Sequence, residues 1–193
     1  MKFLITNMTG FKNKGCEATT KAIVNGITNL EKNARFKSFT GDPEYDALWM
    51  TKNKKVSFLT EPFRGLYFKG HGFFPGCWQY QLINKLGIST PIRRGMEAFR
   101  WGDAILSTGG DIFSSTYGDL SKHLTLIQIA LRFKKPVILV GHSIGPFEKE
   151  REYEAFTKTM RNVQLITVRE SLSFEYLRSI NLKSTKIELT ADP

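Results

Sequence analysis

A chain of 193 residues, 41% of them hydrophobic, is long enough to bury a core, and its length predicts a single domain. No run of about 18 apolar residues occurs, so the sequence predicts no membrane-spanning helix. Residues 1–7 are too short and too soon polar for a signal peptide, and Cys16 and Cys77 lack the spacing of a metal site. We therefore expect a cytoplasmic protein with free thiols and no metal.

The net charge of +10 is unevenly distributed along the chain. Residues 1–100 hold 16 Lys and Arg against 7 acids, whereas residues 101–193 hold 12 against 11. Such a bias favours an anionic partner, either a phosphorylated substrate or an anionic membrane surface, although a solvated basic surface is an equally simple explanation. No nucleic-acid-binding motif accompanies the basic residues, so we expect no nucleic acid partner. Peripheral contact with the inner face of the membrane stays open.

Apolar runs typical of buried strands alternate with helical patterns along the whole chain. The predicted strands are 2–7, 34–40, 55–59, 103–107, 137–140, 163–168 and 186–189. The predicted helices are 17–30, 78–86, 93–100, 120–133, 150–160 and 171–180. This alternation predicts an α/β fold with a doubly wound, mostly parallel, Rossmann-like sheet. Residues 62–78, rich in aromatic residues and glycine, are expected to form an irregular excursion.

Polar and glycine-containing segments follow several of these strands. In open parallel sheets, ligands bind beyond the carboxyl ends of the strands. The first strand leads through Asn13 and Gly15 to a helix N-terminus, where backbone N–H groups can bind an anion. The candidate residues after the later strands are Gly109, Gly110, Asp111, His142, Ser143, Arg169 and Glu170. We expect these segments to face one crevice.

Five short motifs at or after strand ends occur in a fixed order. They are Asn13 to Ala18, Gly109 to Asp111, Gly141 to Phe147, Thr167 to Ser173, and Ala191 to Pro193. In this order they resemble the polysaccharide pyruvyl transferase family. The resemblance implies a GT-B-like enzyme with two Rossmann-like domains facing a cleft. Because the sequence stops directly after a predicted strand, we expect residues 1–193 to be a single Rossmann-like domain, the N-terminal half of such an enzyme.

The reaction implied by the resemblance transfers the pyruvyl group of phosphoenolpyruvate to hydroxyls of a cell-surface glycan, or of its lipid-linked precursor. Phosphate leaves and a ketal forms, with phosphoenolpyruvate as donor substrate and no cofactor. Such chemistry needs cations for the donor's phosphate and carboxylate, and groups that move protons. Arg169 is the candidate anion clamp, His142 a proton donor or phosphate ligand, and Asp111 a base for the acceptor hydroxyl. Each also has a structural interpretation: an ion pair, a hydrogen-bonded histidine and a turn residue.

Three other functions remain open on the sequence. The crevice could belong to a non-catalytic module that binds an acidic glycan or a sugar phosphate. It could belong to a GT-B glycosyltransferase that uses a nucleotide sugar. The spacing Gly141-x-Ser143-x-Gly145 matches an esterase nucleophile motif, but Pro146 disfavours the helix that this motif requires.

Overall fold

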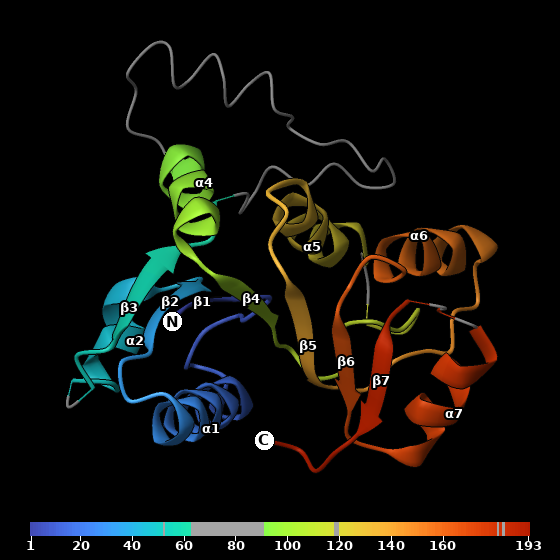
Figure 1. Ribbon diagram of the computed structural model, residues 1–193, viewed down its shortest axis with the longest axis horizontal. Coiled ribbons are helices and arrows are strands. Elements are labelled where there is room, and N and C mark those ends of the chain that lie inside the picture. The colour runs from blue at the N-terminus through green and yellow to red at the C-terminus, as the bar shows by residue number, and fades with distance from the viewer. Residues whose placement is uncertain (52, 63–90, 118–119, 181, 183) are drawn as a thin grey trace.

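The computed structural model describes residues 1–51, 53–62, 91–117, 120–180, 182 and 184–193. Seven parallel strands form one sheet in the order β3-β2-β1-β4-β5-β6-β7 (Figure 1). The strands are β1 (Lys2–Thr6), β2 (Arg35–Thr40), β3 (Val56–Thr60), β4 (Ala104–Ser107), β5 (Val137–His142), β6 (Leu165–Val168) and β7 (Lys186–Leu189). The helices are α1 (Lys14–Leu30), α2 (Pro43–Leu48), α4 (Pro91–Trp101), α5 (Leu120–Arg132), α6 (Glu150–Met160) and α7 (Ser171–Ile180). The predicted doubly wound α/β fold is confirmed.

Helix boundaries differ from the predicted ones where capping decides them. Helix α1 begins three residues earlier than expected because the Asn13 side chain accepts hydrogen bonds from the backbone N–H groups of Gly15 and Cys16. Helix α2 was not predicted; Asp42 caps it and Pro43 occupies its first turn. The predicted helix 78–86 and residues 63–78 of the predicted excursion lie outside the described residues.

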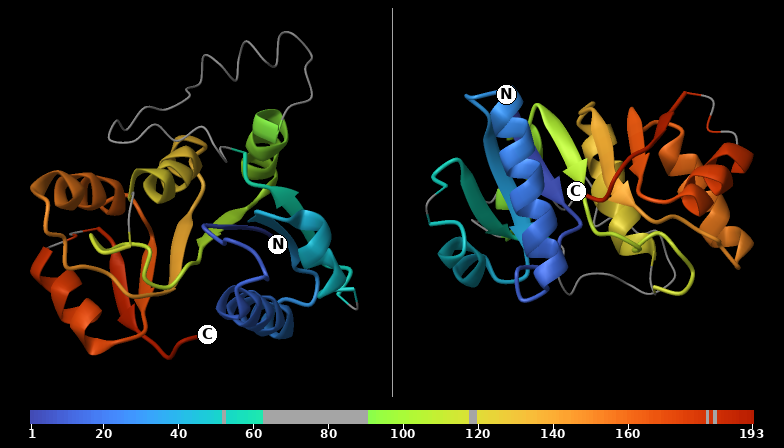
Figure 2. Two further views of the ribbon diagram at one scale, coloured as in Figure 1. Left: turned by 180° about the vertical axis from the view of Figure 1, so that it is seen from behind. Right: turned by 90° about the horizontal axis from the view of Figure 1, so that it is seen from below.

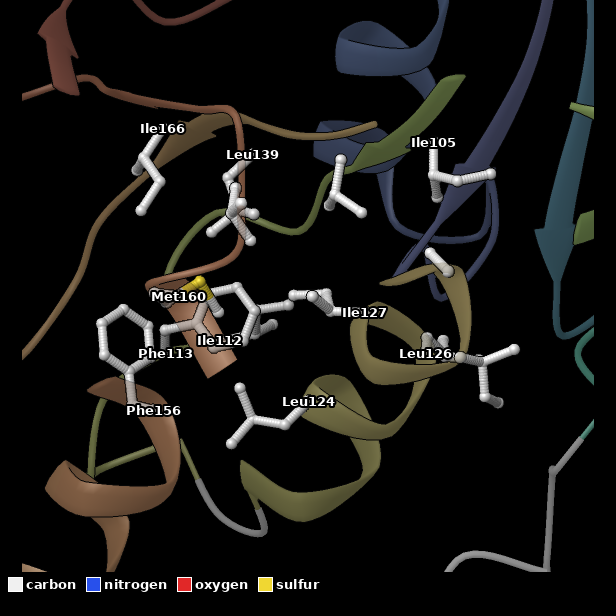
Figure 3. Close-up of a cluster of buried hydrophobic side chains, with 14 of the residues drawn as sticks. Ile105, Ile112, Phe113, Leu124, Leu126, Ile127, Leu139, Phe156, Met160 and Ile166 are labelled. Atoms are coloured by element: carbon white, nitrogen blue, oxygen red, sulfur yellow. The ribbon is translucent and has the colours of Figure 1, made fainter. Parts of the chain in front are cut away.

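The core forms two layers because side chains of the strands alternate between the faces of the sheet. On β1, Leu4 belongs to the cluster with α4, α5 and α6, whereas Phe3 and Ile5 pack with Ile23 of α1. Figures 1 and 2 show α1 on one side of the sheet and α4, α5 and α6 on the other. Figure 3 shows the larger cluster, in which side chains of β4, β5 and β6 meet those of α5 and α6. Because all the strand pairs are parallel, the carboxyl ends of the strands lie at one edge of this sheet.

The position of β1 next to β4 determines where a crevice can form. From β1 the chain moves outward to β2 and β3, and from β4 it moves outward in the opposite direction to β5, β6 and β7. The connections after β1 and β4 therefore diverge, which opens a crevice beyond their carboxyl ends. The chain's last residues return from β7 toward α1 (Figure 1).

A buried carboxylate of α2 holds the connection that follows β1. Asp46 of α2 is fully buried, and it accepts hydrogen bonds from the Phe11 backbone N–H at 2.9 Å and from the Thr40 hydroxyl. Gly10, at φ +125°, is so close that an added Cβ would lie 3.0 Å from the Thr40 hydroxyl oxygen. Helix α2 thus fixes the segment that leads to Asn13.

Candidate functional site

A cleft of about 190 Å³ opens between the segments that follow β1 and β4, where the strand order reverses. Its lining comes from five separate segments of the chain. The lining residues are Asn7, Thr9, Asn13, Gly15, Cys16, Thr19, Thr108, Gly109, Gly110, Asp111, Ile112, Tyr117, Arg169 and Asp192. The structure therefore brings together six of the predicted site residues: Asn13, Gly15, Gly109, Gly110, Asp111 and Arg169. The predicted common edge for these segments is confirmed.

One wall of the cleft is the N-terminus of α1. The Asn13 side chain caps the helix by accepting from Gly15 N at 2.9 Å and from Cys16 N at 3.4 Å. Because Asn13 already satisfies these two donors, the wall contributes the positive end of the helix dipole more than free N–H groups. Cys16 is a free thiol, as expected, and its Sγ lies 3.3 Å from the Thr9 hydroxyl; Cys77 lies outside the described residues.

Arg169 supplies the cation on the opposite wall. Its Nε donates to the Ser143 hydroxyl at 2.9 Å, and its Nη1 donates to Asp192 Oδ2 at 3.0 Å. Its side chain is 30% exposed and that of Asp192 is 56% exposed, so the ion pair is open to solvent and contributes about 0–1 kcal/mol. A guanidinium has five N–H donors, of which these contacts use two. Arg169 therefore lines the cleft with its orientation fixed by Ser143 and Asp192.

Ser143 and Glu170 lie behind Arg169. The Ser143 hydroxyl donates to Glu170 Oε2 at 2.9 Å while it accepts from Arg169. The other Glu170 oxygen accepts from the Ser173 hydroxyl, and that hydroxyl also accepts from the Ile144 backbone N–H. Neither Ser143 nor Glu170 is among the cleft-lining residues; both lie behind Arg169, and their predicted contact with substrate stays a prediction.

His142 lies inside the fold. The residue is fully buried, with Nδ1 3.0 Å from the Gly110 carbonyl oxygen and Nε2 3.1 Å from the Ser107 carbonyl oxygen. Burial lowers the pKa of His142 from 6.5 to about 4, although both carbonyl contacts act in the opposite direction. The neutral ring can donate to only one of these carbonyls. Both ring nitrogens of His142 thus contact backbone carbonyls, and its predicted role as a proton donor or phosphate ligand stays a prediction.

The reason for the buried position of His142 is that β5 extends two residues beyond the predicted end at Val140. A register irregularity between β5 and β6 lies between Leu139 and His142. Gly141, at φ +63°, donates its N–H to the Thr167 hydroxyl at 2.8 Å. The distorted strand turns the imidazole toward the segment after β4, where it joins the carbonyls of Ser107 and Gly110.

The two glycines after β4 allow this segment to lie close to its neighbours. Gly109 has φ +132°, and an added Cβ would lie 2.8 Å from the Asn7 carbonyl oxygen. Gly110 has φ +63°, and an added Cβ would lie 3.7 Å from the Arg169 guanidinium. Asp111, which follows, is exposed and lines the cleft. A carboxylate, a guanidinium and a helix N-terminus therefore face one space.

A larger hollow, about 610 Å³, lies between α5 and α6 and is lined by Gln128, Arg132, Arg151 and Lys158 among others. It holds none of the predicted site residues and lies along the helices, away from the strand ends. In an open parallel sheet the smaller cleft has the position expected of a ligand site.

Comparison with known proteins decides the family. Residues 13–193 match the polysaccharide pyruvyl transferase family. The chain belongs to this family. It is 29% identical over 154 residues to the amylovoran biosynthesis protein AmsJ of Erwinia amylovora, an alignment that covers 76% of this chain and 34% of AmsJ. The chain thus spans about a third of the length of the curated relative that it matches.

One solved structure shares the fold of this family member. The whole chain aligns with 52% of a UDP-glucose:anthocyanidin 3-O-glucosyltransferase in complex with UDP, at a TM-score of 0.52 and 12% identity. It also aligns with 77% of the E. coli heptosyltransferase WaaC, at a TM-score of 0.30 and 10% identity. The first similarity supports the GT-B-like fold. Among the described residues, no helix is long and apolar enough to cross a membrane.

Several residues of the cleft were not singled out from the sequence. Thr9, Thr19 and Tyr117 line it, and Asp192, another lining residue, pairs with Arg169. Asp192 was part of the Ala191-Asp192-Pro193 motif, so the family resemblance contained this signal. Tyr117 belongs to a polar segment after β4 whose path the sequence pattern does not fix.

Proposed function

We propose that this chain forms the donor-facing wall of a pyruvyl transferase that joins the pyruvyl group of phosphoenolpyruvate to hydroxyls of a glycan. The observation that supports it most directly is the Arg169 guanidinium, which lines the cleft and is fixed by its bond to Ser143. A planar, permanently charged fork suits the carboxylate and phosphate of this donor. Family membership supports the same reaction class.

The proposed reaction assigns a place to each of the facing groups. The C2–O bond to phosphate breaks, two sugar oxygens bond to C2, and C3 gains a proton. The two hydroxyl protons end on C3 and on the released phosphate. Arg169 stabilises the negative charge of the donor, and the dipole of α1 acts in the same direction. Asp111 is placed to accept a proton from the acceptor hydroxyl, a role that does not require His142.

We further propose that a second domain completes the site. The chain covers 34% of AmsJ and 52% of the glucosyltransferase chain. Well-oriented reactants account for about 7–11 kcal/mol of barrier lowering in favourable cases. Residues 1–193 alone are therefore expected to bind the donor weakly and not to turn over.

The test is phosphate release from phosphoenolpyruvate with a panel of galactosyl and N-acetylmannosaminyl acceptors. It compares residues 1–193 with a protein that continues to the length of the relative, and mass spectrometry of the acceptor detects the ketal. We expect acceptor-dependent release only from the longer protein. Robust release from residues 1–193 would contradict the two-domain proposal, and titration with nucleotide sugars separates pyruvyl transfer from glycosyl transfer. Binding of a nucleotide sugar without binding of phosphoenolpyruvate would overturn the proposed donor.

A further inference from the structure

A second concave site lies beside the exposed indole of Trp49. This hollow of about 290 Å³ is lined by Lys21, Asn25, Trp49, Met50, Thr51 and Asn53, none of which lines the cleft. We propose that it binds one sugar ring of the acceptor glycan, at a distance from the ring that reacts. The inference rests on the proposed function only in calling the glycan an acceptor.

The chemistry of the lining suits a pyranose ring. Trp49 is 47% exposed and has Lys14 Nζ over one face of its ring, so the other face is the one that a sugar can contact; Met50, 8% exposed, is the apolar residue beside it. A sugar has an apolar C–H face that packs on an aromatic ring and a rim of hydroxyls that need polar partners. Asn25 and Asn53 supply amide donors and acceptors, and Thr51 supplies a hydroxyl. An aromatic surface with a few convergent polar groups is the usual composition of a small-ligand site.

The indole is held in place before any ligand binds. Lys14 Nζ lies 4.2 Å from the Trp49 ring centroid, and the Tyr45 ring centroid lies 6.1 Å away. Lys14 is itself paired with Glu17 at 2.8 Å, and Lys21 is paired with the same carboxylate at 2.5 Å. An ordered aromatic ring loses little conformational entropy on binding, which favours affinity for a weakly interacting ligand.

Helix α1 connects the hollow to the cleft. Gly15, Cys16 and Thr19 line the cleft, whereas Lys21 and Asn25 line the hollow further along the same helix. At 1.5 Å per residue, Gly15 and Asn25 are separated by about 15 Å along the helix axis. Because an α-helix has about 3.6 residues per turn, Lys21 and Asn25 lie on the side of α1 roughly opposite Cys16 and Thr19, so a glycan bound at both sites has to cross the exposed surface of the helix. The arrangement predicts a preference for an oligosaccharide over a monosaccharide.

Leu48, 69% exposed, lies next to Trp49 and raises the alternative of a membrane contact. A membrane contact needs a convex apolar surface, and this site is concave and carries two amides and a hydroxyl. The observations therefore favour the sugar, and the membrane becomes an outcome of the test.

Saturation-transfer NMR with lactose and with N-acetylmannosamine tests the proposal on the 193-residue chain. Trp49→Ala is expected to weaken the transfer to the sugar by about fivefold to tenfold, the scale of an aromatic contact. Trp49→Phe retains an aromatic face and should retain most of the signal, and Asn25→Ala should weaken it. Leu30→Ala, at a residue 91% exposed on α1 and outside both sites, is the matched control. Circular dichroism checks that each variant is folded.

Transfer to either sugar that is equal in wild type, Trp49→Ala and the control, or absent throughout, overturns the proposal. Binding to vesicles with 30% anionic lipid that depends on Trp49 and Leu48, without sugar binding, would assign the surface to a membrane instead. Arg169→Ala should leave the Trp49-dependent part of the sugar signal unchanged, because Arg169 is outside the hollow. If the chain binds sugar in a Trp49-dependent way but does not bind phosphoenolpyruvate, the proposed sugar site is supported and the proposed donor is wrong.

Discussion

Replacement of Arg169 by alanine tests the cleft most directly. The substitution removes a guanidinium that lines the cleft and its bond to Ser143, while Asp192 is only partly buried and remains solvated. A hydrogen bond to a charged group contributes about 1.5–3 kcal/mol. We therefore expect phosphoenolpyruvate affinity to fall by roughly 10- to 150-fold.

A second substitution at Arg169 distinguishes the contribution of its charge to donor affinity from that of its planar shape. Arg169→Lys keeps the positive charge but loses the Nε–H bond to Ser143 and the planar fork, so it should restore affinity only in part. Isothermal titration of phosphoenolpyruvate into residues 1–193 measures the affinity, and kcat/KM in a longer active protein gives an independent readout. Arg178→Ala, an exposed arginine in the last turn of α7, is the matched control and should have no effect.

Unchanged affinity in a folded Arg169→Ala protein would remove Arg169 from the ligand site. Full restoration by Arg169→Lys would show that charge alone matters, and the orienting role given to Ser143 would then be wrong.

Three further predictions concern pH and stability. The pKa of His142 is lowered from 6.5 to about 4 in the folded state, so the unfolded state binds more protons between these two pH values. The free energy of unfolding should therefore fall by up to about 3 kcal/mol as the pH drops through this window. Urea unfolding at several pH values should show this loss in the wild type and no such loss in His142→Gln. An NMR titration that shows a charged imidazole at pH 7 would contradict the lowered pKa, because the two carbonyl contacts would then outweigh the effect of burial. Asp46→Ala should cost about 3 kcal/mol by leaving the buried Phe11 N–H without its acceptor, and an unchanged denaturation midpoint would contradict the anchoring of that segment. Gly26→Ala should raise the free energy of unfolding by about 0.5–1 kcal/mol, since the added Cβ meets nothing within 4 Å, whereas Gly109→Ala should lower it. Thermal unfolding in which both variants shift the melting temperature in the same direction would contradict these expectations.

The strands were predictable because their burial on both faces leaves continuous apolar runs, such as Ala104-Ile105-Leu106 and Val137 to Val140. The common edge followed from parallel strands, since the segments after them must meet there. The buried position of His142 was not predictable. A histidine two residues beyond an apolar run indicates an exposed turn, and only the irregular pairing near Leu139 turns its ring inward. Trp49 gave no signal either, because its hollow depends on how α2 packs beside α1.

The hydrogen bonds around the cleft also determine which of its walls can tolerate amino-acid substitutions. The segments after β4, β5 and β6 are bonded to one another in series, from Gly110 through Ser143 to Arg169, with the His142 ring as a further link. A substitution in any of them disturbs its neighbours, so this wall should tolerate little sequence drift. The surface of α1 and α2 around Asn25 and Trp49 is exposed, and neither of these two residues takes part in that series of bonds. Mutations that change which glycan is accepted should therefore accumulate on the helical side, while the anion-facing side stays constant.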